Sequence, residues 1–266
     1  TIKQAKQLKE WIIDNYKTIK EVFETDSRHT KLQDITFLQE GRHLHIRFRA
    51  TTGEAMGMNM VGKGSGFALK YIKSLNDGLR IISLSGNTCT DKKANAINWI
   101  NGRGKCVVME ACIPKEFLRR ILRVTPEKME YINVQKNLIG SSLAGTIGGN
   151  NCNTTNVVAG IFLSTGQDLG QIGTSSQSIL NLHDNSDSLI STLTMPCLEI
   201  GTVGGGTTLQ DQEKNIDMIA DGSTNKVERL AKNIAYCVMA CELSLLASLC
   251  NNDLIDAHMR FNRGCR

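Results

Sequence analysis

The sequence is poor in the features that mark several special classes of protein. Only 5% of its 266 residues are aromatic, and no stretch interleaves aromatics with Lys and Arg as a nucleic-acid groove would. No apolar run approaches the roughly 20 residues that cross a bilayer, and the N-terminus lacks a signal-peptide pattern. No segment of roughly 20 to 50 residues repeats. These absences predict a soluble globular protein that binds no nucleic acid.

The cysteines do not form the patterns of a disulfide framework or a metal site. None of the nine belongs to a C-x-x-C pair, and no histidine cluster accompanies them. Scattered thiols of this kind are typical of a reducing compartment. Cys237 and Cys241 are one helical turn apart, but a packed helix face explains this spacing better than a shared metal. We therefore expect no metal. The formal net charge of +5 is modest and suits small anionic ligands.

Two kinds of hydrophobic period alternate in roughly the first 80 residues. Apolar positions recur every three or four residues over 2–23 and again over 67–72, so both segments are predicted helices. Residues 44–48 alternate in polarity like a strand with one buried face, and 81–84 form a second apolar strand. This order predicts an α+β fold with helices on one side of an antiparallel sheet.

After residue 84 the composition changes to glycine- and asparagine-rich turns between longer apolar segments. We therefore place a small domain at residues 1–84 and a larger one at residues 85–266. The patterns predict strands over 106–113 and 189–195, helices over 114–123 and 138–145, and a long buried helix over 227–249.

The most informative stretch is small and polar and ends in Asp91, Lys92 and Lys93. One ammonium could hold a carboxylate while the second stabilises an oxyanion, because lysine is a compact donor on a flexible stem. Paired lysines usually form only a solvated surface, so composition alone leaves both interpretations open. Asp168 follows the apolar run 157–163 and needs a partner, which Lys92 would supply if the two loops converge. A helix cap is the alternative for Asp168.

Two glycine-rich segments are ambiguous by themselves. The amides of residues 201–207 could meet a phosphate or a nicotinamide, as those of many plain turns could. The spacing Gly62-x-Gly64-x-Gly66 does not predict a dinucleotide fingerprint, because a methionine-rich segment, 55–60, precedes it instead of a strand. That segment could present backbone to a flat ligand or line a core. A lone histidine such as His258 is more often structural than catalytic.

Taken together, the segments resemble the 3-hydroxy-3-methylglutaryl-coenzyme A (HMG-CoA) reductase family in its eukaryotic-type class. Several long motifs occur in the family's order over nearly the whole chain, so the resemblance is highly specific. The motifs are Gly53-Glu54-Ala55-Met56-Gly57-Met58-Asn59-Met60, Asp91-Lys92-Lys93, Ala96-Ile97-Asn98-Trp99-Ile100, Gly102-Arg103-Gly104-Lys105, Gly166-Gln167-Asp168 and the segment from Gly201 to Thr207.

The resemblance implies reduction of HMG-CoA to mevalonate and CoA by two NADPH in succession. It implies that Lys92 stabilises the oxygen that becomes negative in each step, and that Asp168 hydrogen-bonds to this lysine. His258 matches the C-terminal histidine that protonates the departing CoA thiolate. The implied substrate contacts are Ser85, Asp91, Lys93, Lys136 and Asn156, and the implied NADPH contacts are Ser27, Arg28, Glu54, Met56, Gly57, Met58, Asn59, Met60, Gly204, Gly205 and Gly206.

Two departures from the family pattern affect the expected activity. The family usually has aspartate where Glu54 stands. Its catalytic glutamate lies in an upstream Thr-Thr-Glu-Gly motif that does not occur here, and Thr51-Thr52-Gly53-Glu54 is only a superficial likeness. We therefore expect the chain to be the C-terminal part of a catalytic domain that is inactive alone. The alternatives are a non-catalytic homologue or regulatory module that binds a CoA ligand, and a degradative reductase that prefers NADH.

The resemblance also implies architecture and context. We expect a small ferredoxin-like NADPH-binding domain inserted in a larger helical α+β substrate domain, and a homodimer or homotetramer. Eukaryotic members have N-terminal membrane spans in the endoplasmic reticulum, with the catalytic domain facing the cytosol. Any membrane attachment of this protein would then depend on an N-terminal region absent from the sequence.

Overall fold

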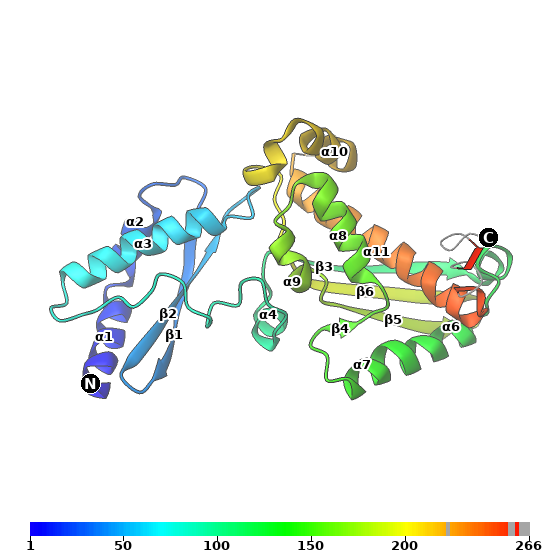
Figure 1. The fold of residues 1–266 in the computed structure, drawn as a ribbon, viewed down its shortest axis with the longest axis horizontal. Helices are drawn as coiled ribbons and strands as arrows, with labels where there is room; N and C mark the ends of the chain where they lie inside the picture. The colour runs from blue at the N-terminus through cyan, green and yellow to red at the C-terminus, as the bar shows by residue number, and fades with distance from the viewer. Residues whose placement is uncertain (222–223, 255–258, 261–266) are drawn as a thin grey trace. The chain divides into compact units, whose positions relative to one another are not determined.

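The computed structural model describes residues 1–221, 224–254 and 259–260, which form two compact units (Figure 1). The smaller unit is Thr1–Asp91 and the larger is Lys92–Arg266. Residues 85–91, expected in the larger domain, belong to the smaller unit. There the Arg47 guanidinium donates to the Thr88 carbonyl, and His45 Nδ1 lies 3.5 Å from Thr88 Oγ1. The predicted α+β class is confirmed.

The smaller unit packs three helices with a two-stranded antiparallel sheet. Its core joins one face of each helix to the sheet through residues such as Ile12, Phe23 and Leu32. The expected opening helix is broken at Asn15, whose Nδ2 donates to the Trp11 carbonyl at 2.8 Å. The elements are α1 (Ile2–Asp14), α2 (Tyr16–Glu24), β1 (Lys31–Glu40), β2 (His43–Thr51) and α3 (Met58–Ser74).

One strand prediction in this unit is confirmed and another is wrong. Residues 44–48 lie in β2, and their partners are in β1, which the sequence patterns did not indicate. Residues 81–84 are not a strand. Ile82 is 75% exposed and Leu84 is 55% exposed, so this apolar run has no packed face to hold it in a sheet. Apolar composition alone therefore misled the prediction.

Gly64, the middle glycine of the spacing Gly62-x-Gly64-x-Gly66, has a packing role. It is buried in α3, and a Cβ there would lie 2.7 Å from the carbonyl oxygen of Phe23 on α2. The absent side chain therefore lets α2 and α3 approach closely. Gly62, on the same helix, has nothing within 4 Å of an added Cβ. Only one of these two glycines is required by packing.

Substituting Gly64→Ala is expected to destabilise the smaller unit by about 1–3 kcal/mol, because the added methyl group meets backbone that cannot rotate away. Gly62→Ala is the matched control. It is expected to be neutral or to stabilise α3 by up to about 1 kcal/mol, since alanine is the better helix former. Chemical denaturation of both variants checks this, and equal unfolding free energies would contradict it.

The larger unit contains a four-stranded sheet in the order β3-β6-β5-β4. β3 and β5 are antiparallel to β6, and the short β4 is parallel to β5. The strands are β3 (Lys105–Pro114), β4 (Gly149–Asn150), β5 (Ser178–Asn185) and β6 (Ser188–Leu198). The helices and turns are α4 (Ala96–Asn101), α5 (Lys115–Phe117), η1 (Leu118–Leu122), α6 (Pro126–Ile132), η2 (Asn133–Ile139), α7 (Gly140–Leu143), α8 (Thr154–Thr165), η3 (Leu169–Gln171), α9 (Ile172–Ser175), η4 (Gly205–Thr208), α10 (Gln210–Ala220) and α11 (Lys226–Cys250).

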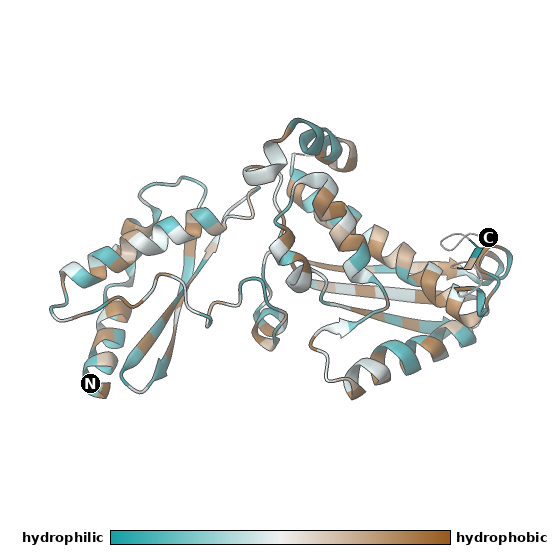
Figure 2. Cartoon of the chain, viewed as in Figure 1, coloured by the Kyte–Doolittle hydropathy of each residue, from teal (hydrophilic) through white to brown (hydrophobic). Residues whose placement is uncertain are grey.

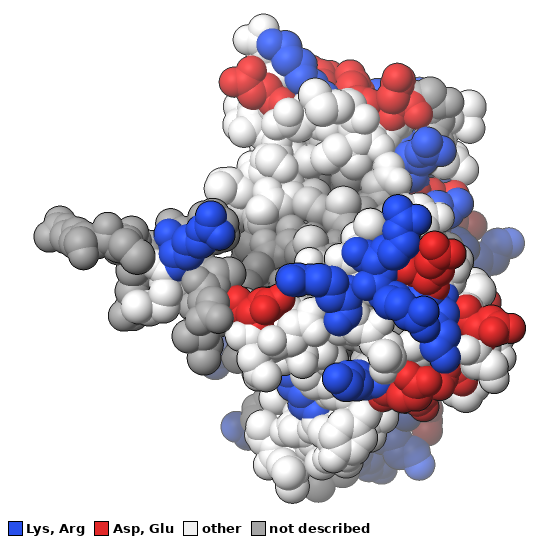
Figure 3. All heavy atoms as spheres, turned by 90° about the vertical axis from the view of Figure 1, so that its right-hand side faces the viewer, with Lys and Arg blue, Asp and Glu red and all other residues white. Residues whose placement is uncertain are grey.

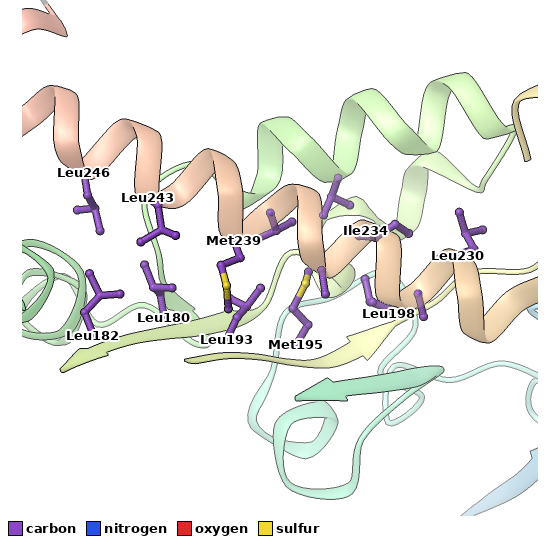
Figure 4. Close-up of a cluster of buried hydrophobic side chains, with 14 of the residues drawn as sticks. Leu180, Leu182, Leu193, Met195, Leu198, Leu230, Ile234, Met239, Leu243 and Leu246 are labelled. Atoms are coloured by element: carbon purple, nitrogen blue, oxygen red, sulfur yellow. The ribbon is translucent and has the colours of Figure 1, made fainter. Parts of the chain in front are cut away.

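The long predicted helix is α11, and it forms the core of the larger unit. Its buried stripe faces the leucine and methionine side chains of β5 and β6 (Figure 4). Hydrophobic residues run along most of its length (Figure 2). Contrary to expectation, this helix is long and apolar enough to pass for a membrane span by length and composition. The core helix of a soluble protein passes the same test, and the buried residues of α11 pack against the sheet.

Candidate functional site

Lys92 lies in a loop, residues 92–95, that is held by hydrogen bonds from residues on its C-terminal side. Asn95 caps the N-terminus of α4 by accepting the Asn98 N–H at 2.9 Å. The side-chain amides of Asn95 and Asn98 donate to the Lys93 carbonyl at 2.6 and 3.1 Å. Lys92 itself has a φ of 60°, a left-handed conformation that is uncommon for a residue with a side chain. The asparagine hydrogen bonds therefore fix the backbone at Lys93, the residue after Lys92.

Asp168 approaches this lysine from the end of α8. The helix ends at Thr165 and Gly166 after it has a φ of 67°, so the chain turns sharply toward η3. Asp168 caps η3, since its Oδ1 accepts the Gly170 N–H at 2.9 Å. Its Oδ2 lies 3.1 Å from Lys92 Nζ. The expected convergence of the two loops is confirmed, and both interpretations of Asp168, cap and lysine partner, hold at once.

The ion pair between Lys92 and Asp168 is open to solvent. The lysine side chain is 49% exposed and the aspartate side chain is 34% exposed. A pair so exposed contributes at most about 1 kcal/mol to folding, because water screens the attraction. Folding stability alone therefore gives little reason for its position. An ammonium held by a carboxylate and reachable from solvent is suited to an oxygen that gains negative charge.

The glycine-rich segment 201–207 packs directly against the Asp168 turn. Gln167, next to Asp168, exchanges two hydrogen bonds with Gly201, at 3.0 and 2.9 Å. Gly166 and Gly206 meet backbone to backbone, because a Cβ on either one would overlap the other residue's carbonyl oxygen. Two motifs that are far apart in the sequence are therefore joined beside Lys92. This close approach gives a structural reason for both glycines.

Two further expected substrate contacts, Lys136 and Asn156, lie elsewhere in the larger unit. Asn156 is exposed in the first turn of α8. Lys136 is exposed on η2 and lines a cavity of about 490 Å³ together with Lys128, Tyr131 and Cys250. The described structure places neither one in a direct contact with Asp168. Their roles stay predictions.

Basic residues on the larger unit have acidic neighbours. The face drawn in Figure 3 carries Lys and Arg interleaved with Asp and Glu. Among the residues around η1, Arg123 pairs with Asp253 at 2.7 Å and Arg120 with Glu116 at 3.6 Å. Acidic partners are thus present for these two arginines of the larger unit.

The N-terminus of α8 is organised by a buried carboxylate that sequence reasoning missed. Glu242 on α11 is fully buried and accepts the backbone N–H groups of Cys152 and Asn153 at 2.6 and 2.7 Å, and the Thr154 hydroxyl at 3.1 Å. Burial, together with the Glu242 carboxylate, raises the pKa of the Cys152 thiol to about 11. That thiol is therefore protonated and poorly nucleophilic at neutral pH. A lone acid within the apolar stripe of a helix was the available signal.

The expected NADPH contacts of the smaller unit cluster at two turns. Ser27 stabilises the turn after α2, since its Oγ accepts the Thr30 N–H at 3.1 Å, and Arg28 is exposed beside it. Gly57 caps α3 with a φ of 88°, and the methionines that follow form the first turn of this helix. Glu54 precedes that cap. Of the expected substrate contacts, Ser85 and Asp91 belong to the smaller unit and Lys93 to the larger.

One expected catalytic residue cannot be placed. His258 lies outside the described residues. Within the described part of the chain, no group of three or more His, Cys, Asp or Glu side chains could hold a metal ion. Sequence reasoning also missed Gln171, a fully buried residue of η3 whose Oε1 accepts the Lys92 N–H at 3.3 Å. Its position three residues after Asp168, one turn along, was the only local signal.

Known proteins match the chain over nearly its whole length. The family model described as hydroxymethylglutaryl-coenzyme A reductase matches residues 1–263. The reductase of Agrotis ipsilon is 48% identical, with 98% of this chain and 32% of that protein covered. Reductase 1 of Dictyostelium discoideum is 43% identical, with 98% of this chain and 49% of that protein covered. The chain thus spans from about a third to about half of the length of these relatives.

A solved structure has the same fold. The class II reductase of Streptococcus pneumoniae, bound to NADPH in open conformations, superposes with a TM-score of 0.67 at 19% identity, over 94% of this chain and 68% of that one. Its identity is too low to carry residue roles, so it supports the fold alone. The sequence matches and the shared fold agree with one another. The chain belongs to the hydroxymethylglutaryl-coenzyme A reductase family.

Proposed function

We propose that the complete protein containing this chain reduces HMG-CoA to mevalonate and CoA with two molecules of NADPH. The observation that carries the proposal is the Lys92–Asp168 pair at 3.1 Å, joined to the glycine-rich segment 201–207 in a chain of this family. The half-exposed ammonium lies where an acyl oxygen could reach it. Each reduction step places negative charge on that oxygen, which is the charge an ammonium stabilises.

The residues act on the substrate at three points. Lys92 stabilises the alkoxide as the thioester carbonyl becomes tetrahedral, and protonation of the alkoxide gives a hemithioacetal. The carbon–sulfur bond of the hemithioacetal then breaks to give an aldehyde, and His258 protonates the departing thiolate. Lys92 stabilises the aldehyde oxygen in the second reduction, which yields the primary alcohol. Asp168 keeps the ammonium oriented throughout, through its 3.1 Å contact.

The residues of the smaller unit fit NADPH chemically. When bound, NADPH supplies one hydride in each reduction step. Arg28 is exposed on the turn that Ser27 stabilises, and its planar guanidinium is suited to bidentate contact with a 2′-phosphate. Gly57 is the N-cap of α3, a helix of 17 residues whose N-terminus favours anionic groups. The methionines after it offer apolar surface to a flat ring.

The test is NADPH oxidation, followed by absorbance, in the complete protein with HMG-CoA. We expect two NADPH oxidised for each CoA thiol released, no oxidation with acetyl-CoA, and slower turnover with NADH. Residues 1–266 alone are expected to be inactive, because the family's catalytic glutamate has no counterpart in them. Mevalonate formation by residues 1–266 would contradict that last expectation.

Two outcomes would replace the proposal. Binding of HMG-CoA without any NADPH oxidation would favour a non-catalytic module that binds a CoA ligand. Faster turnover with NADH, or in the direction of mevalonate oxidation, would favour a degradative reductase. The exposed Arg28 argues against the second alternative, since NADH has no 2′-phosphate for it to contact.

The proposal extends to assembly and location. We propose a homodimer or homotetramer, which light scattering of the complete protein would measure. We also propose that the parent protein is anchored in the endoplasmic reticulum membrane through an N-terminal region, with this part facing the cytosol. Membrane fractionation and protease protection of the complete protein test that location in intact microsomes.

A further inference from the structure

Lys92 has a backbone conformation that its own side chain disfavours. Its φ of 60° lies in the left-handed region, where the Cβ crowds the following carbonyl group. Such a conformation persists only where surrounding contacts hold it. The strained backbone sets the direction in which the flexible Lys92 side chain leaves the loop. An ordinary loop conformation would give a different direction. The contacts that hold this backbone therefore decide where the ammonium points.

Gln171 supplies such a contact. It is fully buried at the end of η3, and its side-chain Oε1 accepts the Lys92 N–H at 3.3 Å. Its own N–H donates to the Asp168 carbonyl at 2.9 Å, which fixes the turn from which the side chain extends. A buried amide is costly unless it is hydrogen-bonded, so packing alone would favour an apolar residue here. The amide thus joins the strained lysine to the rigid part of the larger unit.

The same short turn also holds the other end of the lysine. Asp168 begins η3 and contacts Nζ at 3.1 Å, while Gln171 ends it and contacts the backbone N–H. Gly170 lies between them, and a Cβ there would come 2.8 Å from the Lys92 Cδ and 3.0 Å from its Nζ. The aliphatic part of the lysine side chain therefore lies across this glycine. One turn of the chain determines both where the side chain starts and where it ends.

We propose that Gln171 is a positioning residue for Lys92. By accepting the Lys92 N–H it holds the left-handed backbone, and so places the ammonium where Asp168 and the substrate oxygen meet it. This inference rests on the proposed function, in which Lys92 stabilises the oxygen that becomes negative. Gln171 itself does not touch the reacting atoms in this account. Its effect passes entirely through Lys92.

The activity test uses the variant Gln171→Met in the complete protein, because methionine keeps the length of the side chain and removes the acceptor. A misplaced catalytic group costs up to about 100-fold, so we expect kcat to fall about 10- to 100-fold with KM for HMG-CoA little changed. In the Lys92→Ala background, Gln171→Met is expected to lower kcat no further, since Gln171 acts only through Lys92. If Gln171→Met lowered kcat by the same factor in the wild-type protein and in Lys92→Ala, the proposal would be overturned.

Two further variants separate positioning from stability. Asn133→Leu removes another fully buried side-chain amide, which donates to the Leu180 carbonyl at 2.9 Å and accepts from the Asn137 amide at 2.8 Å, and is expected to retain kcat. Gln171→Glu keeps an oxygen acceptor at the same place and is expected to restore most of the kcat that Gln171→Met loses. If Gln171→Glu unfolds at the wild-type denaturant midpoint and still loses as much kcat as Gln171→Met, the hydrogen bond to Lys92 is not the cause and the inference fails.

A measurement that needs no turnover distinguishes failure of this inference from failure of the proposed function. In protein labelled with ¹⁵N-lysine, the Lys92 amide is expected to exchange with solvent faster in Gln171→Met than in wild type, and at the wild-type rate in Asn133→Leu. An unchanged exchange rate would overturn the positioning role even if the enzyme were active. Faster exchange in a protein without any reductase activity would keep the contact and reject only the function.

Discussion

The variant Lys92→Ala is expected to lower kcat for NADPH-dependent reduction of HMG-CoA by about 10²- to 10³-fold. Removing one oriented donor to a developing oxyanion typically costs about 3–4 kcal/mol of transition-state stabilisation. KM for HMG-CoA is expected to change much less, because the thioester oxygen carries little charge before reaction. Folding is expected to change by less than about 1 kcal/mol, since the pair with Asp168 is 49% and 34% exposed. Steady-state kinetics and chemical denaturation measure the two effects separately.

Lys214→Ala is the matched control for this experiment. Lys214 is also exposed and also lies near an aspartate, Asp211, at 3.7 Å, but on α10. We expect wild-type kcat and KM from it. A Lys92→Ala variant that retains wild-type kcat would show that another group stabilises the oxyanion. A parallel loss in both variants would indicate a general effect of net charge.

Glu242→Leu is expected to destabilise the larger unit by about 3–5 kcal/mol. The substitution leaves the N–H groups of Cys152 and Asn153 and the Thr154 hydroxyl without their buried acceptor. Each unsatisfied buried donor costs about 1–3 kcal/mol. The carboxylate also lies at the N-terminus of α8, where negative charge is favourable. Guanidinium chloride denaturation measures the loss as a lower midpoint.

Glu228→Leu makes the same change on the exposed side of the same helix. Glu228 lies in the first turn of α11, so its loss is expected to cost less than about 1 kcal/mol through the helix dipole alone. Glu242→Gln retains one oxygen acceptor and is expected to fall between the two. If Glu242→Leu were as stable as Glu228→Leu, the hydrogen bonds from the start of α8 would have no net worth in the folded protein.

Sequence patterns predicted the elements whose packing is periodic. The stripe along 227–249 became α11, and the alternation over 189–195 became β6, because both have one buried face. Residues 81–84 failed because strand formation needs a partner as well as apolar composition, and these residues are largely exposed. The opening helix was predicted without its break at Asn15. The apolar pattern does not show the hydrogen bond from the Asn15 side chain to the Trp11 carbonyl.

The candidate site was predictable only where charge gave a signal. Asp168 follows an apolar run, so its carboxylate was expected to need a partner, and Lys92 was the candidate. Their contact is present. Gln171 was not found, because a neutral amide acquires its role only when folding brings it to the Lys92 N–H. Glu242 was missed for a related reason, since its three donors lie about 90 residues away in the sequence. Tertiary hydrogen bonds of this kind leave only weak local signals, such as the lone acid in the apolar stripe of α11.

The backbone contact between Gly166 and Gly206 restricts how this protein can change over evolutionary time. A side chain at either position would overlap the other residue's carbonyl oxygen, so neither position can vary while the other stays in place. Replacing both glycines together would place two side chains in the same occupied space. No pair of substitutions at these positions is therefore expected to be neutral. The Asp168 turn and the segment 201–207 are therefore expected to be inherited as one unit, and chimaeras that exchange only one of them with an unrelated loop should lose the site.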